Sequence, residues 1–466
     1  MKTIKIIFCI IFSLLICVPT IRFNFEHNAI SEIDNRKLTE NPFSSNDDEE
    51  DLTEKIEDYV NDRIGFRNEM ITAYTVLNDK LFNKMVHPSY SYGKQGYVFG
   101  AGLTTVNNQF SDFHQSFANM VKEIENYCKE RNIPFVFVFN PAKPAVLNEY
   151  VADGVNYSRV WAEKFLKTID EYGINYVDNT VTLKNAYNQG EVVFNKKYDA
   201  NHWNDLGAYY GVNAILNNLK TQMPNIHINT LDEFDITQIL QTSLPVSKFT
   251  INEKVPKFTP INGDIEYIAK EYQSEIEFNP SYTAFGYYIN EARKEGSSPK
   301  ALVFQGSYMN GMGYKFLANS FGEYIYVHDY QNVLNFDYYY NIFKPDCVIF
   351  EVAEYTLSEQ YFDYEKMKTF KLQPTVESAE ANAKEILNSS LDDEQVTAEK
   401  GNSLTKISWD TDEEIEYAWI SLDESYYDMQ KTDNGYTLTV KNSDFEENED
   451  KIEITAFGNS KLKIYS

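Results

Sequence analysis

Continuous apolar runs alternate with helical patterns along most of the chain. Each run has the length of a strand, and a lack of polar positions is typical of parallel strands buried on both faces. The clearest runs are "PFVFVFN" (134–140), "ALVFQG" (301–306), "YIYVHD" (324–329) and "CVIFEVAE" (347–354). Helical spacing from Phe117 to Cys128 precedes the first run, and a helical pattern around Trp161 leads to "INYVD" (174–178). This alternation predicts a doubly wound parallel sheet of the α/β class.

Other patterns occur on both sides of this region. Apolar residues from Leu52 to Leu81 follow helical spacing with a break or kink at Gly65, and "SYSYGKQGYVFG" (89–100) predicts a hairpin. Residues 225 to about 298 mix short apolar clusters with Pro and Asn turns, which predicts an insertion with β-structure packed on the sheet. From about 376 the chain becomes acidic, and its closing runs alternate at period two. We expect one α/β domain over 51–375 and a small β-sandwich over 376–466.

The N-terminal segment has the pattern of a membrane anchor. Lys2 and Lys5 precede an apolar run from Ile6 to Val18, which is near the lower length limit for a membrane span. Positive charge before the run orients the amino end inside, and no small-residue cleavage pattern follows. We expect a signal-anchor over 1–23 and a polar tether over 24–50 that supplies a Ser or Asp helix cap. The remaining chain would lie outside the cell membrane, and a secreted protein is the alternative.

Charge and cysteine content exclude several classes of function. Acidic residues outnumber basic ones by 70 to 42, so the 466-residue chain has a formal net charge of −28. This charge opposes phosphate backbones and excludes nucleic acid as a partner. Cys9, Cys17, Cys128 and Cys347 are too few for a disulfide framework and lack metal-ligand spacing. We expect no metal or other cofactor, and buried thiols at Cys128 and Cys347.

A candidate nucleophile follows one of the predicted strands. The run "ALVFQG" ends immediately before Ser307, and open α/β sheets place reactive groups at the carboxyl ends of parallel strands. Gly306 permits a sharp turn there, which leaves the serine hydroxyl and its N–H accessible. Backbone N–H groups at the start of a helix also suit a developing oxyanion. An ordinary turn with a helix cap is the alternative.

A base for this serine occurs in "YDANHWNDLGA" (198–208). A serine hydroxyl becomes a good nucleophile when an imidazole accepts its proton and a carboxylate holds the other ring nitrogen. Asp199 lies three residues before His202 and is near enough in the chain to reach its ring. Asn204 or Asp205 is expected to cap the following helix. The alternative is a turn with a packed histidine beside Trp203.

Seven short motifs occur in the order found in a known family. They are "NRKLTENP", "IEDYVNDRIGFRNEM", "YGKQGYVFG", "FVFNPAKPAV", "DANHWNDLGA", "FQGSYMNG" and "KPDCVIFEVAE". Over roughly residues 30–360 the chain resembles the SGNH-hydrolase-like proteins of cell-surface polysaccharide O-acetylation. These include the alginate O-acetylation group and Gram-positive relatives called DHHW proteins. In this family the aspartate and histidine precede the serine, a circular permutation of the usual hydrolase order, as they do here.

The resemblance implies a role for each of the three candidate residues. Ser307 would accept an acetyl group, His202 would act as general base and then acid, and Asp199 would orient it. A membrane-bound O-acyltransferase partner would supply the acetyl group, and a hydroxyl of an exported or cell-surface polysaccharide would receive it. An acetylesterase on the same residues and a non-catalytic glycan-binding scaffold are the alternatives. The motif around the serine reads "QGSY" where many relatives have "GDSF".

Weaker candidates for oxyanion or substrate contacts are Asn310, Gly306, Asn140 and Trp203. Asn310 is the first choice for a second oxyanion donor because it follows Ser307 closely, and Asn140 ends a strand at the same predicted sheet edge. Turn chemistry is the alternative for both. Lys143 and Arg67 match positions of family motifs, where a solvated or salt-bridged role is expected as readily as a functional one.

Overall fold

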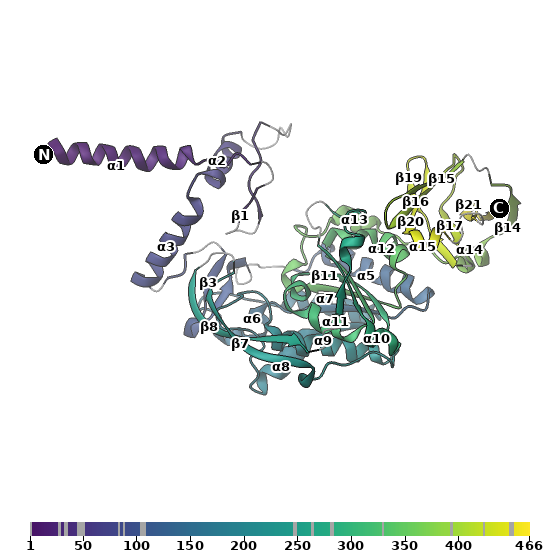
Figure 1. Ribbon diagram of the computed structural model, residues 1–466, viewed down its shortest axis with the longest axis horizontal. Helices are drawn as coiled ribbons and strands as arrows, with labels where there is room; N and C mark the ends of the chain where they lie inside the picture. Colours follow the sequence, from purple (N-terminus) through teal and green to yellow (C-terminus); the bar gives the residue numbers. More distant parts are fainter. Residues whose placement is uncertain are drawn as a thin grey trace.

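The computed structural model describes most of the chain. The described residues are 2–26, 29–31, 36–43, 52–82, 84–86, 89–102, 109–245, 249–261, 265–279, 284–328, 330–391, 395–422, 425–446 and 452–466. Part of the predicted tether, residues 44–50 with the expected helix caps, lies outside them. Helix α1 (Lys2–Ile21) projects away from the rest of the molecule (Figure 1).

A sheet of seven strands lies at the centre of the described chain, in the order β6-β5-β13-β11-β12-β10-β9. Its strands are β5 (Phe135–Asn140), β6 (Tyr176–Asp178), β9 (Ile265–Tyr267), β10 (Phe285–Asn290), β11 (Lys300–Gln305), β12 (Glu323–His328) and β13 (Cys347–Ala353). The strands from β6 to β12 are parallel, which confirms the predicted doubly wound sheet. Strands β10 and β9 continue it as an antiparallel edge. Part of the segment 225–298 therefore extends the sheet instead of packing on it.

Alternate side chains of the parallel strands enter two separate cores. Phe137 and Phe350 pack on one face, under α5 (Asp112–Glu130), α7 (Val160–Glu171) and α12 (Phe336–Phe343). Val138 and Ile349 pack on the other face, under α8 (Asn179–Asn188), α9 (Asp205–Lys220) and α11 (Tyr314–Ser320). Burial of both faces is the reason that these runs contain almost no polar positions.

The four cysteines divide into two buried and two exposed residues. Cys128 on α5 and Cys347 on β13 are buried free thiols, as predicted, whereas Cys9 and Cys17 on α1 are exposed. Burial raises the pKa of both buried thiols, so they stay protonated and unreactive.

The N-terminal region consists of helices and a hairpin between α1 and the sheet (Figure 1). The predicted break near Gly65 separates α2 (Leu52–Arg63) from α3 (Arg67–Phe82), and Phe66 in the turn has a left-handed φ of 61°. The predicted hairpin is β3 (Tyr90–Tyr92) paired antiparallel with β4 (Val98–Gly100). A longer hairpin of β7 (Phe234–Ser243) and β8 (Thr250–Pro260) follows α9.

Helix α1 has the composition of a membrane span. Its segment Thr3–Ile21 has a mean hydropathy of 2.6, and none of it is buried in the molecule. A secretory signal has a similar length and composition, so α1 suits both an anchor and a signal.

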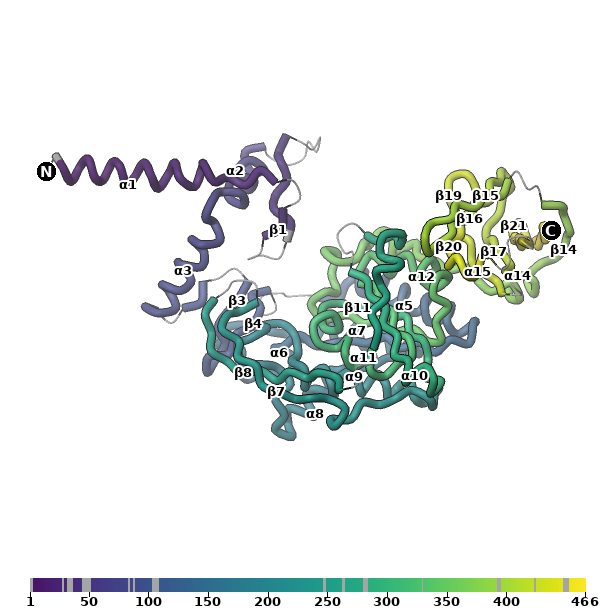
Figure 2. Tube along the Cα trace, viewed as in Figure 1, coloured from purple at the N-terminus to yellow at the C-terminus, as the bar shows by residue number. Residues whose placement is uncertain are grey.

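The C-terminal region is rich in strands, as predicted, and its two sheets enclose a common core. One sheet contains β14 (Glu385–Ser389), β17 (Tyr417–Leu422), β18 (Ser425–Asp428), β21 (Glu453–Gly458) and β22 (Lys461–Tyr465). The other contains β15 (Val396–Lys400), β16 (Leu404–Asp410), β19 (Gln430–Thr432) and β20 (Gly435–Lys441). In Figure 2 this region lies at the end of the molecule opposite to α1. The domain boundary at residue 376 stays a prediction.

A buried ion pair joins this region to the α/β core. Arg131, just after α5, lies 2.9 Å from a carboxylate oxygen of Asp428 on β18, and the two side chains are 12% and 5% exposed. The Tyr127 hydroxyl donates to the same carboxylate, and the Asn341 amide donates to the Asp428 carbonyl at 2.7 Å.

We expect Asp428→Ala to lower the free energy of unfolding by about 3 kcal/mol, because the Arg131 charge stays largely buried without its partner. Chemical denaturation followed by circular dichroism measures this change. Glu171→Ala is the control, since Glu171 pairs with Lys167 at 3.4 Å while both side chains are mostly exposed. It should change stability little. Equal effects of the two substitutions would contradict the prediction.

Candidate functional site

The structure brings Ser307, His202 and Asp199 together at the carboxyl edge of the parallel sheet. His202 Nε2 lies 2.7 Å from Ser307 Oγ, and His202 Nδ1 lies 2.8 and 2.9 Å from the two carboxylate oxygens of Asp199. Because Nδ1 faces a carboxylate, it carries the ring proton and leaves Nε2 free to accept one from the serine. The three side chains therefore form a continuous hydrogen-bonded chain from carboxylate to hydroxyl.

The loop before α9 holds Asp199 and His202 in this arrangement. Asp199 has a left-handed φ of 51°, a conformation that aspartate tolerates better than most residues. Its Oδ1 accepts from the backbone N–H groups of Asn201 at 3.2 Å and His202 at 3.0 Å. Asn204, not Asp205, then caps α9 by accepting from Gly207 N–H at 2.9 Å. One short segment thus orients both the carboxylate and the imidazole.

The charges of Asp199 and His202 support each other. Burial raises the pKa of Asp199, but attraction to His202 and hydrogen bonds from it outweigh this effect and hold the pKa at about 2. Burial lowers the pKa of His202, while Asp199 raises it by more, so it lies above the usual value of 6.5. The pair therefore keeps the carboxylate ionised and makes the imidazole a stronger base.

Ser307 is the first residue of a helical segment that continues through residues 309–313 into α11. A second hydroxyl, from Tyr355, lies 2.9 Å from His202 Nε2 and 3.3 Å from Ser307 Oγ. Burial raises the pKa of Tyr355 well above its ordinary value, so the phenol stays neutral and can donate. Tyr355 follows the last buried strand by two residues and was not expected from the sequence.

Glu351 is a further residue that the sequence analysis missed. It lies two residues before the carboxyl end of β13 with no exposed surface, and its two oxygens accept from Asn140 Nδ2 and Gly306 N–H, both at 2.7 Å. The Asn140 oxygen in turn accepts from Asn179 Nδ2 at 2.8 Å. Burial raises the pKa of Glu351 to about 7, although the two donated hydrogen bonds oppose the rise. A single acid inside the apolar run "CVIFEVA" was the signal for it.

These contacts correct the sequence-based interpretation of Gly306, Asn140 and Trp203. The Gly306 N–H donates to Glu351, and so does one N–H of the Asn140 amide, whose side chain is completely buried, so neither group faces a substrate as an oxyanion donor. Trp203 is fully buried, and its indole N–H donates to the Tyr308 carbonyl at 3.1 Å. It therefore supports the turn after the nucleophile from behind and does not face a substrate.

Asn310 keeps a donor available. Its side-chain oxygen accepts from Gln305 Nε2 at 2.5 Å, and among the described residues no group accepts from its amide N–H. Asn310 is half-buried and follows Ser307 by three residues, in the π-helical turn 309–313.

Lys143 and Arg67 have structural contacts. Lys143 is completely buried, and its ammonium donates to the carbonyls of Val98 at 2.8 Å and Lys196 at 3.3 Å, so the expected solvated or salt-bridged role is wrong for it. Burial lowers the pKa of Lys143 to about 7. Arg67 forms the expected salt bridge, with Asp62 at 3.8 Å.

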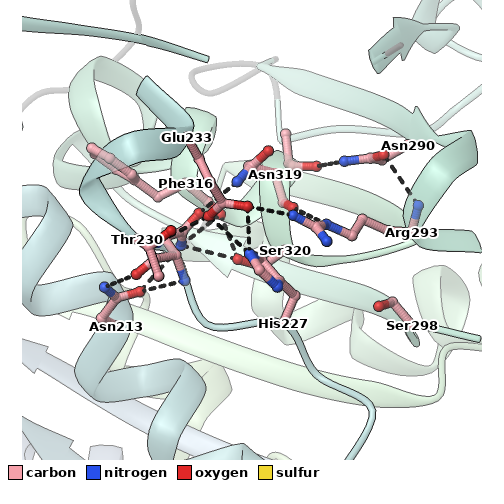
Figure 3. Close-up of polar contacts among 12 residues, drawn as sticks. Asn213, His227, Thr230, Glu233, Asn290, Arg293, Ser298, Phe316, Asn319 and Ser320 are labelled. Carbon is pink, nitrogen blue, oxygen red and sulfur yellow. Dashed lines mark hydrogen bonds and ion pairs between the residues drawn. The ribbon is translucent and has the colours of Figure 1, made fainter. Parts of the chain in front are cut away.

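A second polar cluster surrounds Glu233 (Figure 3). Glu233 lies 2.8 Å from His227 Nε2 and 2.7 Å from Arg293 Nη2, and the Ser320 hydroxyl donates to the Phe316 carbonyl at 2.9 Å. Because its charges and hydroxyl are paired internally, this cluster ties the segment 227–233, which precedes β7, to Arg293 and to α11 and offers no nucleophile. Within the described parts of the chain, no group of three His, Cys, Asp or Glu side chains is placed to hold a metal ion.

Comparisons with known proteins confirm the resemblance expected from the ordered motifs. Residues 91–245 match the family model described as SGNH hydrolase-like domain, acetyltransferase AlgX. This match includes Asp199 and His202 and ends before Ser307. A search of curated proteins finds no match.

The solved structures that are similar to this chain have low sequence identity and TM-scores below 0.5. Bacillus cereus PatB1 is 17% identical, with 61% of this chain and 97% of that chain covered at a TM-score of 0.45. The O-acetyltransferase domain of Pseudomonas putida AlgJ is 14% identical, with 60% and 99% covered at 0.41. Pseudomonas aeruginosa AlgX is 13% identical, with 76% and 87% covered at 0.39.

We expect stability to depend on pH through Glu351. A folded pKa of about 7, against 4.5 for an ordinary glutamate, means that the folded chain binds an extra proton between these values. Stability is therefore lost as the pH rises through this window, by about 3 kcal/mol relative to Glu351→Gln. Chemical denaturation at a series of pH values measures the difference. Glu359→Gln, at an exposed position, should follow the wild type; a Glu351→Gln curve parallel to the wild type would refute the prediction.

Proposed function

We propose that this protein is an extracytoplasmic O-acetyltransferase that modifies an exported or cell-surface polysaccharide through an acetyl-enzyme on Ser307. The observation that carries the proposal is the hydrogen-bonded chain from Asp199 through His202 to Ser307 at the carboxyl edge of a parallel sheet. The family match to a domain described as acetyltransferase AlgX supports acetyl transfer. Helix α1 supports a location at the outer side of a membrane.

In the first half of the reaction, Ser307 Oγ attacks the carbonyl carbon of a donor acetyl ester while its proton passes to His202 Nε2. The new C–O bond forms a tetrahedral intermediate whose negative oxygen needs donors. The Ser307 N–H at the start of its helix and the Asn310 amide are the proposed donors, with the Tyr355 hydroxyl beside them. Collapse then breaks the bond to the leaving alkoxide, which takes the proton from His202.

In the second half, a sugar hydroxyl replaces the leaving group. His202 Nε2 accepts the proton of this hydroxyl, the sugar oxygen attacks the acetyl carbonyl, and Ser307 leaves with the proton returned by His202. Asp199 stays ionised throughout and stabilises the imidazolium. Water in place of the sugar would make the same residues an acetylesterase. Acetyl transfer therefore requires an acceptor that competes with water, which a polysaccharide held near the site provides.

An acetyl adduct on Ser307 is the first expected result. The full-length protein in detergent, treated with p-nitrophenyl acetate and analysed by peptide mass spectrometry, should carry the adduct and release p-nitrophenol. Ser307→Ala should lose the adduct and about 10³-fold or more of the turnover. Ser298→Ala is the control, because the Ser298 hydroxyl donates to the Asn225 carbonyl in an exposed position. If the wild type forms no adduct, the proposal fails.

The same assay separates transfer from hydrolysis. If acetylated oligosaccharide forms faster than free acetate, the result supports the transferase. If no oligosaccharide accelerates the decay of the acyl-enzyme, the result favours the esterase.

Asp199→Asn should slow ester turnover by about 10⁴-fold, because an amide neither holds the reactive tautomer of His202 nor stabilises its cation. Turnover requires neutral His202, so the rate rises with pH through a midpoint above 6.5 in the wild type. The variant should move this midpoint to lower pH. A pH–rate profile measures both effects. Asp153→Asn, whose side chain is 91% exposed, should keep the wild-type profile; an unmoved midpoint in Asp199→Asn would count against the assignment.

A further inference from the structure

Helix α3 exposes large apolar side chains along one side. Phe66 in the preceding turn and Met70, Tyr74, Leu77 and Leu81 on the helix are between 42% and 64% exposed. Their spacing of three and four residues places them on one face, which we name the α3 apolar face. A contiguous exposed set of this kind marks an interaction surface in a soluble domain.

The opposite side of α3 packs against the rest of the protein, although that side carries more polar residues than the exposed one. Thr75 is 1% exposed and its hydroxyl donates to the Ile71 carbonyl at 2.8 Å. Val76 packs on a cluster that contains Tyr90, Val98 and Ala200, and Asp79 accepts from the Tyr92 hydroxyl at 2.5 Å. The helix is therefore fixed in orientation, with short and polar side chains inward and bulky apolar ones outward.

Backbone contacts tie the start of α3 to the end of the candidate membrane span. The Gly65 N–H donates to the Pro19 carbonyl at 3.0 Å, and a side chain at Gly65 would stand 2.4 Å from Arg22 Cβ. The Arg63 guanidinium donates to the carbonyls of Glu26 at 2.8 Å and Thr39 at 2.8 Å. If α1 crosses a bilayer, this joint sets the first turn of α3 at the bilayer surface.

The charge of α3 also suits a lipid surface. Arg67 and Lys80 balance Glu69 and Asp79, so the helix is formally neutral within a chain of net charge −28. The strongly acidic surface elsewhere is repelled by anionic headgroups, whereas α3 is not. Tyr74 belongs to the aromatic types enriched at the membrane interface, and Phe66 is an apolar aromatic of the kind that interfacial helices bury.

We propose that the α3 apolar face lies in the interfacial layer of the bilayer that holds α1. Helix α3 then acts as a second, surface-bound contact that fixes how the catalytic region stands on the membrane. Val76 on its inner side packs on the hydrophobic cluster that also contains Ala200, the neighbour of Asp199. The catalytic segment therefore rests on a helix that rests on lipid, within reach of an acetyl group delivered from a membrane-embedded donor. This last consequence depends on the proposed function, whereas the lipid contact does not.

A tryptophan at position 74 reports the contact directly. The four native tryptophans, Trp161, Trp203, Trp409 and Trp419, are all buried at 5% exposure or less, so they add a constant background. The full-length Tyr74→Trp protein is reconstituted in phosphatidylcholine vesicles. The emission maximum of the added tryptophan should lie at shorter wavelength than that of a water-exposed tryptophan standard in detergent-free buffer. Its added emission should be quenched by acyl-chain-brominated lipid and be insensitive to iodide.

Tyr426→Trp is the matched control, because Tyr426 is 40% exposed in the strand-rich region. Its added emission should show the reverse pattern, quenched by iodide and unchanged by brominated lipid. The double variant Leu77→Asp, Leu81→Asp in the Tyr74→Trp background should lose the quenching by brominated lipid while p-nitrophenyl acetate turnover is retained, which shows that the fold is intact.

Two outcomes overturn the proposal. In the first, carbonate does not extract the protein from the vesicles, but iodide quenches the added emission of Tyr74→Trp and brominated lipid does not. The α3 apolar face would then be a surface for a protein partner. The other is extraction by carbonate, which would refute the anchor and the lipid contact together. Neither outcome affects the Ser307 adduct, so failure here is distinguishable from failure of the proposed acetyl transfer.

Discussion

A carboxylate buried inside a parallel sheet constrains the end of this protein that holds the candidate site. Glu351 has no contact with solvent, so each of its oxygens requires a donor. One donor comes from the end of β5 and the other from the backbone immediately before Ser307. The carboxylate therefore joins three neighbouring strands, β5, β13 and β11, at their carboxyl ends. The turn that presents the nucleophile cannot move without leaving a buried acid unsatisfied.

The second half of the site is held by a different device. Asp199 accepts from the backbone of its own turn and from the His202 ring, so the same oxygen that orders the loop also orients the base. Lys143 donates to the carbonyls of Val98 and Lys196 and thereby connects this loop to the β3–β4 hairpin. His202 and Ser307 thus belong to two segments that meet at the 2.7 Å hydrogen bond between these two side chains and at the hydrogen bond from the Trp203 indole to the Tyr308 carbonyl. This arrangement preorganises the pair before substrate binds.

Several elements were predictable because their causes are local. The apolar runs gave the central parallel strands, and Asp199, His202 and Ser307 were found by residue type, order and position relative to a strand end. The Asn140 and Gly306 assignments failed for a non-local reason: both groups are buried against Glu351 and donate to it, and Glu351 lies more than forty positions from Gly306 in the chain. Trp203 failed similarly, since only the approach of the Tyr308 carbonyl shows why its indole N–H points inward.

The sequence by itself determined the α/β class, the apolar N-terminal helix, the strand-rich C-terminal region and the residue types of a hydrolase-like site. It could do so because hydrophobic periodicity, charge and turn residues act over a few positions of the chain. Folding decided the rest. It placed β13 between β5 and β11 in the sheet. Glu351 and Tyr355, which follow β12 in the sequence, therefore lie close to the segment of Ser307, which precedes β12. Folding also set the orientation of α3, in which Val76 packs on a cluster that contains Tyr90 and Val98 while the larger apolar side chains stay exposed. Pairing between distant strands and competition for buried surface are properties of the whole chain, and no local pattern encodes them.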